Sequence, residues 1–148
     1  MALTPQELRR YRRDVVKWAE ATVHVRHPLT GVLGPLRLEK HQEAWLREAT
    51  RRDRQGRFVY RVAVASWPKR EGKTLCTALG LAWRMTCFQG QRCGILANSE
   101  RQAQSNIFDA LTSFFRDTPA LAQYGADIQV RKLSVAVLGN TAECFPAN

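Results

Sequence analysis

The sequence has no long apolar run: nowhere do about 18 uncharged apolar residues follow one another. A transmembrane helix needs about 20 such residues, so none is expected. Charges at Glu7, Arg9 and Arg10 interrupt the N-terminal stretch, which therefore lacks the apolar region of a signal peptide. These absences predict a soluble, cytoplasmic chain with no membrane contact.

Paired cysteines are also lacking. The four cysteines are widely spaced and form no C-x-x-C pair, and no His stands near them at zinc-ligand spacing. We therefore expect Cys76, Cys87, Cys93 and Cys144 to be reduced thiols in the core.

Acidic residues are few: 13 Asp and Glu stand against 23 Lys and Arg, a formal net charge of +10. Such a charge predicts attraction to polyanions, which include nucleic acid, nucleotides and acidic partners, without choosing among them. Apolar residues, in contrast, make up 45% of the 148 residues and include four Trp and six Phe. That is enough for one folded domain with a proper core.

The N-terminal third predicts two helices joined by a loop. Thr4 to Glu7 can form a capping box, and apolar residues then recur at helical spacing, which predicts an amphipathic helix over residues 5–22. Residues 24–37 contain two Pro and two Gly and predict a wrapping loop. A second helix is expected to begin near Glu39. We divide the chain accordingly into an N-terminal helix and loop, 1–37, and a main domain, 38–148.

The main domain predicts an α/β fold built on a parallel sheet with flanking helices, because strands and helices alternate along it. The expected elements are a buried strand over 58–64, a helix over 73–88, a strand over 93–97, a helix from Ser99, capped with Gln102, to Arg116, and a terminal hairpin with strands at 128–130, 133–138 and 141–145.

Residues Trp67 to Thr74 read W-P-K-R-E-G-K-T and carry the clearest chemistry. A phosphate-binding P-loop ends in Gly-Lys-Thr at the start of a helix, where backbone N–H groups and the helix dipole attract anions. Lys73 is then expected to reach the β- and γ-phosphates of ATP, and Thr74 to ligate Mg²⁺. The alternative is a loop in which Lys73 is an ordinary solvated charge.

The loop departs from the common pattern G-x-x-x-x-G-K-T, because Trp67 replaces the first Gly and two basic residues follow. A basic residue early in the loop resembles the deviant loop of phage terminase large subunits, the DNA-packaging ATPases. The resemblance implies a P-loop NTPase fold of the RecA type, and a catalytic role at the γ-phosphate for Lys69, with Arg70 as a competitor for that role. Both residues can instead simply raise the local potential.

Two further segments agree with this resemblance. Leu38 to Gln42 resembles the adenine-recognising Q motif, in which a Gln amide both donates and accepts. Residues 95–103 resemble the strand and turn that follow the P-loop helix, and residues 144–148 the strand before the Walker B motif. The expected nucleotide-binding residues are Gln42, Pro68, Lys69, Arg70, Glu71, Gly72, Lys73 and Thr74.

No apolar strand ending in Asp-Glu follows the loop, so the Walker B carboxylates that organise Mg²⁺ and activate water are missing. We expect the chain to stop before them and before the nuclease domain, and to bind ATP without efficient hydrolysis. The resemblance implies double-stranded DNA, the portal protein and the terminase small subunit as partners, and a homo-oligomeric ring at the procapsid in the host cytoplasm.

Two clusters of basic residues are candidates for contact with DNA phosphates, although neither is assigned to that role by the sequence. They are Arg9, Arg10, Arg12, Arg13 and Lys17, and Arg51, Arg52, Arg54 and Arg57. Two alternatives stay open: a helicase-like P-loop ATPase, and a basic nucleic-acid-binding module without ATPase activity.

Overall fold

The computed structural model describes residues 3–97, 99, 101 and 104–146. Its first helix, α1 (Pro5–Tyr11), begins at the predicted capping box: the Thr4 hydroxyl accepts from the Glu7 N–H, and the Glu7 carboxylate accepts from the Thr4 N–H. This start of the first helix is confirmed. The bonds hold the Glu7 carboxylate ionised and lower its pKa.

The predicted single helix over 5–22 is wrong, because a second helix, α2 (Val15–Thr22), begins separately at Asp14. The Asp14 carboxylate accepts hydrogen bonds from the N–H groups of Val16 and Lys17 at 3.0 and 3.1 Å. An Asp that caps in this way competes with a continuing helix for those donors. The apolar spacing runs through the break, so periodicity alone does not reveal it.

Residues 24–37, predicted as a loop, contain a two-stranded antiparallel hairpin. Its strands are β1 (His24–Arg26) and β2 (Leu33–Pro35), and Val25 faces Gly34 across the pair. The next helix, α3 (Lys40–Ala49), begins at Glu39 as expected.

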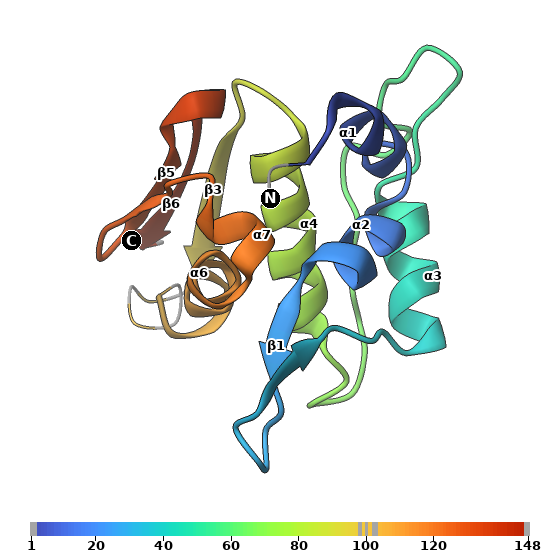
Figure 1. Ribbon diagram of the computed structural model, residues 1–148. Helices are drawn as coiled ribbons and strands as arrows, with labels where there is room; N and C mark the ends of the chain where they lie inside the picture. Colours follow the sequence, from blue (N-terminus) through green and yellow to red (C-terminus); the bar gives the residue numbers. More distant parts are fainter. Residues whose placement is uncertain (1–2, 98, 100, 102–103, 147–148) are drawn as a thin grey trace.

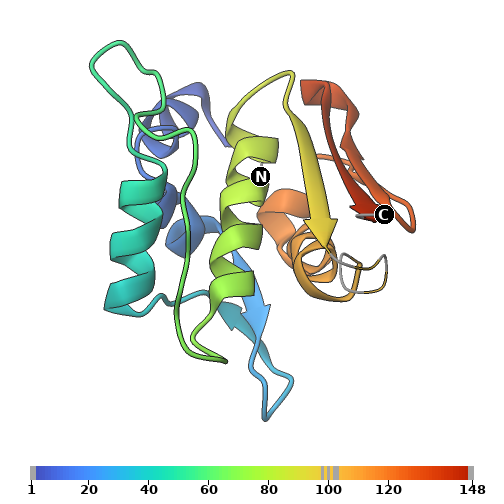
Figure 2. The ribbon, with the colours of Figure 1, turned by 180° about the vertical axis from the view of Figure 1, so that it is seen from behind.

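Residues 58–64 do not form the predicted buried strand. The segment is extended but carries no strand pairing beyond a single bridge between Arg52 and Phe58, and the side chains of Val62 and Val64 are each 77% exposed. A strand exists only when a neighbour satisfies its backbone groups, and the described residues place α3 and α4 on its two sides instead (Figures 1 and 2). Residues 58–64 are therefore extended, as their sequence favours, but they do not pair with the four-stranded sheet.

Helix α4 (Lys73–Cys87) runs through the middle of the molecule, where the sequence predicted a helix (Figure 1). Eight of its residues are buried, among them Leu79 and Trp83. It contacts α2, α3 and α6 (Asp109–Asp117), so the core forms around it.

The sheet is mixed, not parallel as expected. Its four strands lie in the order β3 (Arg92–Ala97), β6 (Asn140–Pro146), β5 (Lys132–Val135) and β4 (Asp127–Ile128). Only β3 and β6 are parallel, because β4, β5 and β6 follow one another through short turns. The predicted terminal hairpin is confirmed, although β5 ends earlier than expected, in a 3₁₀ turn, η2 (Ala136–Leu138).

Helical elements follow β3 from Gln104 to Ala122. A π-helical turn, η1 (Gln104–Phe108), leads into α6, and a short helix, α7 (Pro119–Ala122), follows. The predicted cap at Gln102 falls outside the described residues. Among the described residues, no helix is both long and apolar enough to cross a membrane.

Candidate functional site

Helix α4 starts at the Gly-Lys-Thr sequence, as a P-loop requires. Gly72 is its N-cap residue, in the left-handed region with φ +83°, and no side chain caps the first turn. A side chain at position 72 would collide with the amide of Gln42, so the close approach requires Gly. The first turn contains no acidic residue, so its backbone N–H groups and the helix dipole favour an anion there.

Lys73 folds back into the loop. Its Nζ donates a hydrogen bond to the carbonyl oxygen of Trp67, which lies at the start of the loop, and the side chain is half-buried. The ammonium group therefore lies inside the turn that the loop makes. Thr74, next along, is exposed at the same helix end.

Gln42 lies against the loop. Its side chain is only 7% exposed; Oε1 accepts from the Glu39 N–H at 3.0 Å, and Nε2 donates to the Glu71 carbonyl at 3.1 Å. The Nε2 donor therefore joins the first turn of α3 to the loop, while the Oε1 acceptor caps the start of α3 itself. Adenine recognition by the remaining N–H and lone pair stays a prediction.

An aromatic cluster fixes the other side of the loop. The ring of Trp67 makes edge contacts with His41 and Trp45, with centroids 5.1 and 5.7 Å apart, and the Trp45 indole N–H donates to the Val64 carbonyl at 3.1 Å. The imidazole of His41 also lies 3.6 Å from a carboxylate oxygen of Glu71. His41 and Trp45 belong to the segment that resembles the Q motif, but their contacts with Trp67 depend on how α3 packs and were not predicted.

The middle of the loop is exposed and basic. Pro68, Lys69 and Arg70 face solvent, and neither basic side chain forms a hydrogen bond or ion pair with the part of the chain that is described. Arg70 has φ +70°, the single left-handed residue other than glycine among the described positions. This conformation costs a non-glycine residue roughly 1–2 kcal/mol, so the loop holds Arg70 in a fixed, strained geometry.

No metal site is built from protein groups alone: the described residues contain no cluster of three or more His, Cys, Asp or Glu side chains. Mg²⁺ that accompanies a nucleotide needs few protein ligands, because phosphates and water supply the rest. The role of Thr74 as such a ligand stays a prediction.

Three basic residues pack on aromatic rings of the core and so contribute to the fold. Arg12 lies over the ring of Phe88, and its Nε donates to the Cys87 carbonyl. Arg52 lies over Phe88 and Phe58, and its Nε donates to the Gly56 carbonyl at 2.6 Å. Arg84 in turn lies over Phe58, 4.2 Å from the ring centroid. These contacts form a ladder of alternating guanidinium and aromatic groups.

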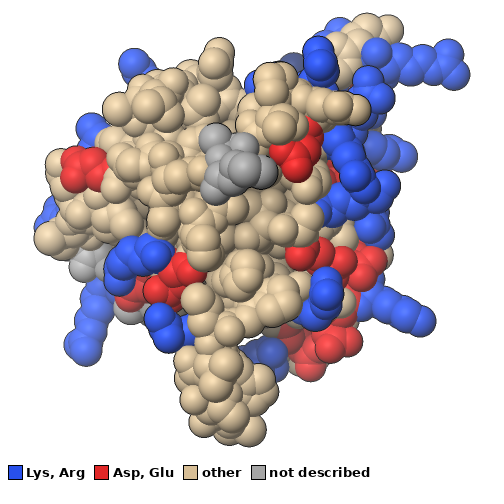
Figure 3. Space-filling model, viewed as in Figure 1, with Lys and Arg blue, Asp and Glu red and all other residues tan. Residues whose placement is uncertain are grey.

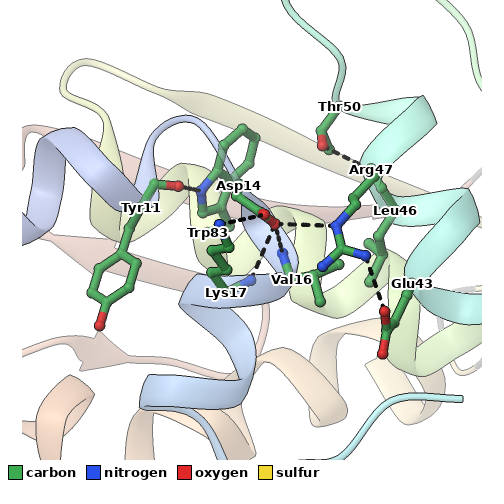
Figure 4. Close-up of polar contacts among 9 residues, drawn as sticks. All are labelled: Tyr11, Asp14, Val16, Lys17, Glu43, Leu46, Arg47, Thr50 and Trp83. Carbon is green, nitrogen blue, oxygen red and sulfur yellow. Dashed lines mark hydrogen bonds and ion pairs between the residues drawn. The ribbon is translucent and has the colours of Figure 1, made fainter. Parts of the chain in front are cut away.

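Asp14 is the centre of a second polar network, which sequence reasoning missed (Figure 4). Besides capping α2, its carboxylate lies 3.5 Å from Arg47 Nε and 3.8 Å from Lys17 Nζ, and Arg47 also pairs with Glu43 at 3.0 Å. The Asp14 carboxylate thus ties the start of α2 to α3. An Asp directly before an apolar helical stretch was the available signal.

Comparison with known proteins adds no relative: no family model matches the chain, and no curated protein matches it.

Proposed function

We propose that residues 67–74 bind the phosphates of Mg²⁺-ATP, and that the chain is the ATP-binding part of a DNA-packaging motor of the terminase large subunit type. In such a motor, ATP hydrolysis drives double-stranded DNA into the procapsid. The observation that carries the proposal is the placement of Lys73: it is the first residue of an uncapped helix, and its ammonium group is turned into the loop.

Each residue of the loop has a part in this proposal. Lys73 exchanges the Trp67 carbonyl for a phosphate oxygen, a stronger, charge-assisted partner. The free N–H groups of the first turn of α4 bind the same anion, and the Thr74 hydroxyl ligates Mg²⁺. Lys69 acts at the γ-phosphate, with Arg70 as the competing residue for that role; both side chains are exposed in the loop. Gln42 and Glu71 hold the loop against α3.

The wider setting is proposed on the resemblance alone: a homo-oligomeric ring at the portal protein, with the terminase small subunit, in the host cytoplasm. Because the sequence has no apolar strand ending in Asp-Glu, we expect this chain to bind ATP with little turnover. A helicase-like ATPase would share Gln42 and Lys73, but small residues usually fill the loop positions that Lys69 and Arg70 occupy.

A nucleic-acid-binding module without ATPase activity is the second candidate, favoured by the two basic clusters, in residues 9–17 and 51–57, which line two hollows. The two functions are compatible in one chain. They differ in what loss of Lys73 does, since a module of this kind does not need it.

Titration of a fluorescent ATP analogue with Mg²⁺ into the chain and into Lys73→Ala tests the proposal. Because Lys73→Ala removes the charge-assisted hydrogen bonds between the ammonium group and the phosphates, it is expected to weaken binding of the analogue about 10- to 100-fold. Lys132→Ala is the matched control: its Nζ pairs with Glu143 at 3.1 Å on the sheet, away from the loop, and it should bind like the wild type.

Circular dichroism and thermal unfolding must show that all three proteins are folded. Equal affinity of Lys73→Ala and the wild type would refute the role of the loop. A folded wild type that binds no nucleotide would refute the proposal for this chain as well.

A further inference from the structure

The two basic clusters, far apart in sequence, lie on one face of the molecule. The hollow beside α1 is lined by Arg9, Arg10 and Lys17 and has a volume of about 480 Å³; a second, of about 640 Å³, lies between the start of α2 and residues 50–56. Both are also lined by Arg13 and Asp14, so they form one continuous surface. Figure 3 shows Lys and Arg side chains gathered along this side. We call this surface the basic face.

Many cations on or near the basic face already have a partner. Arg12 and Arg52 belong to the aromatic ladder, Arg57 pairs with Asp53 at 2.9 Å, Arg51 with Glu48 at 3.5 Å, and Arg47 and Lys17 with Asp14. Four do not: within the described part of the chain, no hydrogen bond or ion pair reaches the side chains of Arg9, Arg10, Arg13 and Arg54. Four guanidinium groups with unused donors therefore line two adjoining hollows.

The chemistry of the basic face fits phosphate. A guanidinium group presents a planar set of donors that matches a phosphate in two-fold hydrogen bonding, which a lysine cannot do. A protein partner needs an apolar or aromatic anchor at the centre of its interface. None of the large hydrophobic side chains that the described chain exposes lines either hollow. The basic face therefore presents positive charge but no hydrophobic anchor, which favours a phosphate-bearing partner over a protein.

The same lack of aromatic side chains argues against a single strand. Single-stranded nucleic acids are held by stacking of bases on aromatic rings, and among the residues that line the two hollows there is no aromatic residue. A duplex needs none, because its bases stay stacked and its outer surface is phosphate.

We propose that the basic face binds the phosphate backbone of a double-stranded nucleic acid, through Arg9, Arg10, Arg13 and Arg54. The contacts go to phosphates, so binding does not depend on base sequence. The face lies at the Thr50 end of α3, and the loop that contacts Gln42 lies at the other end, about 15 Å away along a ten-residue helix. The inference rests on the nucleic-acid-binding candidate above and not on the nucleotide site, so Lys73→Ala should leave duplex binding unchanged.

Asp14 limits this binding, since it is the negative charge that both hollows share. Asn caps a helix about as well as Asp, so Asp14→Asn should keep α2 while it removes the charge and releases Arg47 and Lys17. A charge about 6 Å from a phosphate in water corresponds to roughly a 3-fold change in affinity. Tighter duplex binding by Asp14→Asn is therefore expected, by about 3-fold or more.

The test is fluorescence anisotropy with labelled duplex DNA, without nucleotide, over a range of salt concentrations. Four phosphate contacts predict a slope of log affinity against log salt of about −3.6. The variant Arg10→Ala/Arg13→Ala/Arg54→Ala keeps one contact, so its slope should fall to about −0.9, with an affinity loss of at least about 100-fold at low salt. Duplex RNA of equal length is the second probe, and the tighter of the two identifies the natural duplex.

The control variant loses the same charge elsewhere: Arg37→Ala/Lys40→Ala/Arg92→Ala changes three exposed cations outside both hollows. It should bind DNA nearly as well as the wild type. Equal loss in both triple variants would show a mere effect of net charge and overturn the proposal. So would tighter binding of single-stranded DNA, competition by polyglutamate as effective as by unlabelled duplex, or a folded wild type that binds no duplex at low salt.

Discussion

Substitution of Gly72 by Ala tests how the loop is joined to α3. The new Cβ would lie 3.3 Å from Gln42 Cδ and closer still to Nε2, so the amide must move and give up its bond to the Glu71 carbonyl. Loss of that bond costs about 1 kcal/mol. The left-handed conformation at φ +83° adds roughly 1–2 kcal/mol for Ala. We expect Gly72→Ala to lower the free energy of unfolding by about 2–3 kcal/mol in all.

Gly139→Ala is the matched control for this substitution. Gly139 is also left-handed, with φ +66°, but a Cβ there meets nothing within 4 Å. It should therefore lower the free energy of unfolding by the conformational part alone, about 1–2 kcal/mol. The difference between the two variants measures the collision with Gln42.

A double-mutant cycle in urea unfolding completes the test. In a Gln42→Ala background the collision disappears, so Gly72→Ala should then cost only about 1–2 kcal/mol, a coupling of about 1 kcal/mol. If Gly72→Ala costs the same with and without Gln42, the two residues do not touch and the described contact between α3 and the loop is wrong.

Two further predictions concern the basic face and the core. Arg52→Ala loses a hydrogen bond to Gly56 and two ring contacts, so we expect it to lower the free energy of urea unfolding by about 2 kcal/mol. Arg54→Ala, in the same turn, should lower it hardly at all. Equal losses would contradict the division between arginines that stabilise the fold and arginines without a partner in the described chain. Burial raises the pKa of Cys87 to about 12, and only the thiolate reacts, so iodoacetamide should leave Cys87 unlabelled in the folded chain at a pH where an ordinary thiol, with a pKa of about 8.5, is half ionised. Labelling should become fast when urea unfolds the chain and exposes the thiol, which is 1% exposed in the folded state, and mass spectrometry of tryptic peptides would contradict the prediction if Cys87 reacted equally fast folded and unfolded.

Local signals in the sequence predicted local structure well. The capping box at Thr4, the start of α4 after Gly72, and the terminal hairpin each depend on residues within a few positions of one another. The sequence predicted Gln42 for adenine recognition, from a motif; its hydrogen bond to the loop was not predicted, since nothing in the helical spacing of α3 specifies what the helix contacts.

Features that depend on distant partners were not predictable in this way. Residues 58–64 have the alternation of a strand, but whether a strand forms depends on a neighbour that the segment itself does not encode. The sheet is mixed because three of its strands are joined by short turns, and alternation of strands and helices earlier in the chain says nothing of that. The basic face likewise required the fold, since Arg13 and Arg54 are brought together only when α3 packs beside α2.

The position of Trp67 also gives the protein a built-in optical probe. Trp18 and Trp83 are fully buried in the core, so their fluorescence is insensitive to what happens at the surface. Trp67 and Trp45 are half-buried and touch at the loop, and the Trp67 carbonyl is the group that holds Lys73. Any anion that draws Lys73 away alters the surroundings of this indole pair first, and the emission of the unlabelled chain registers the event.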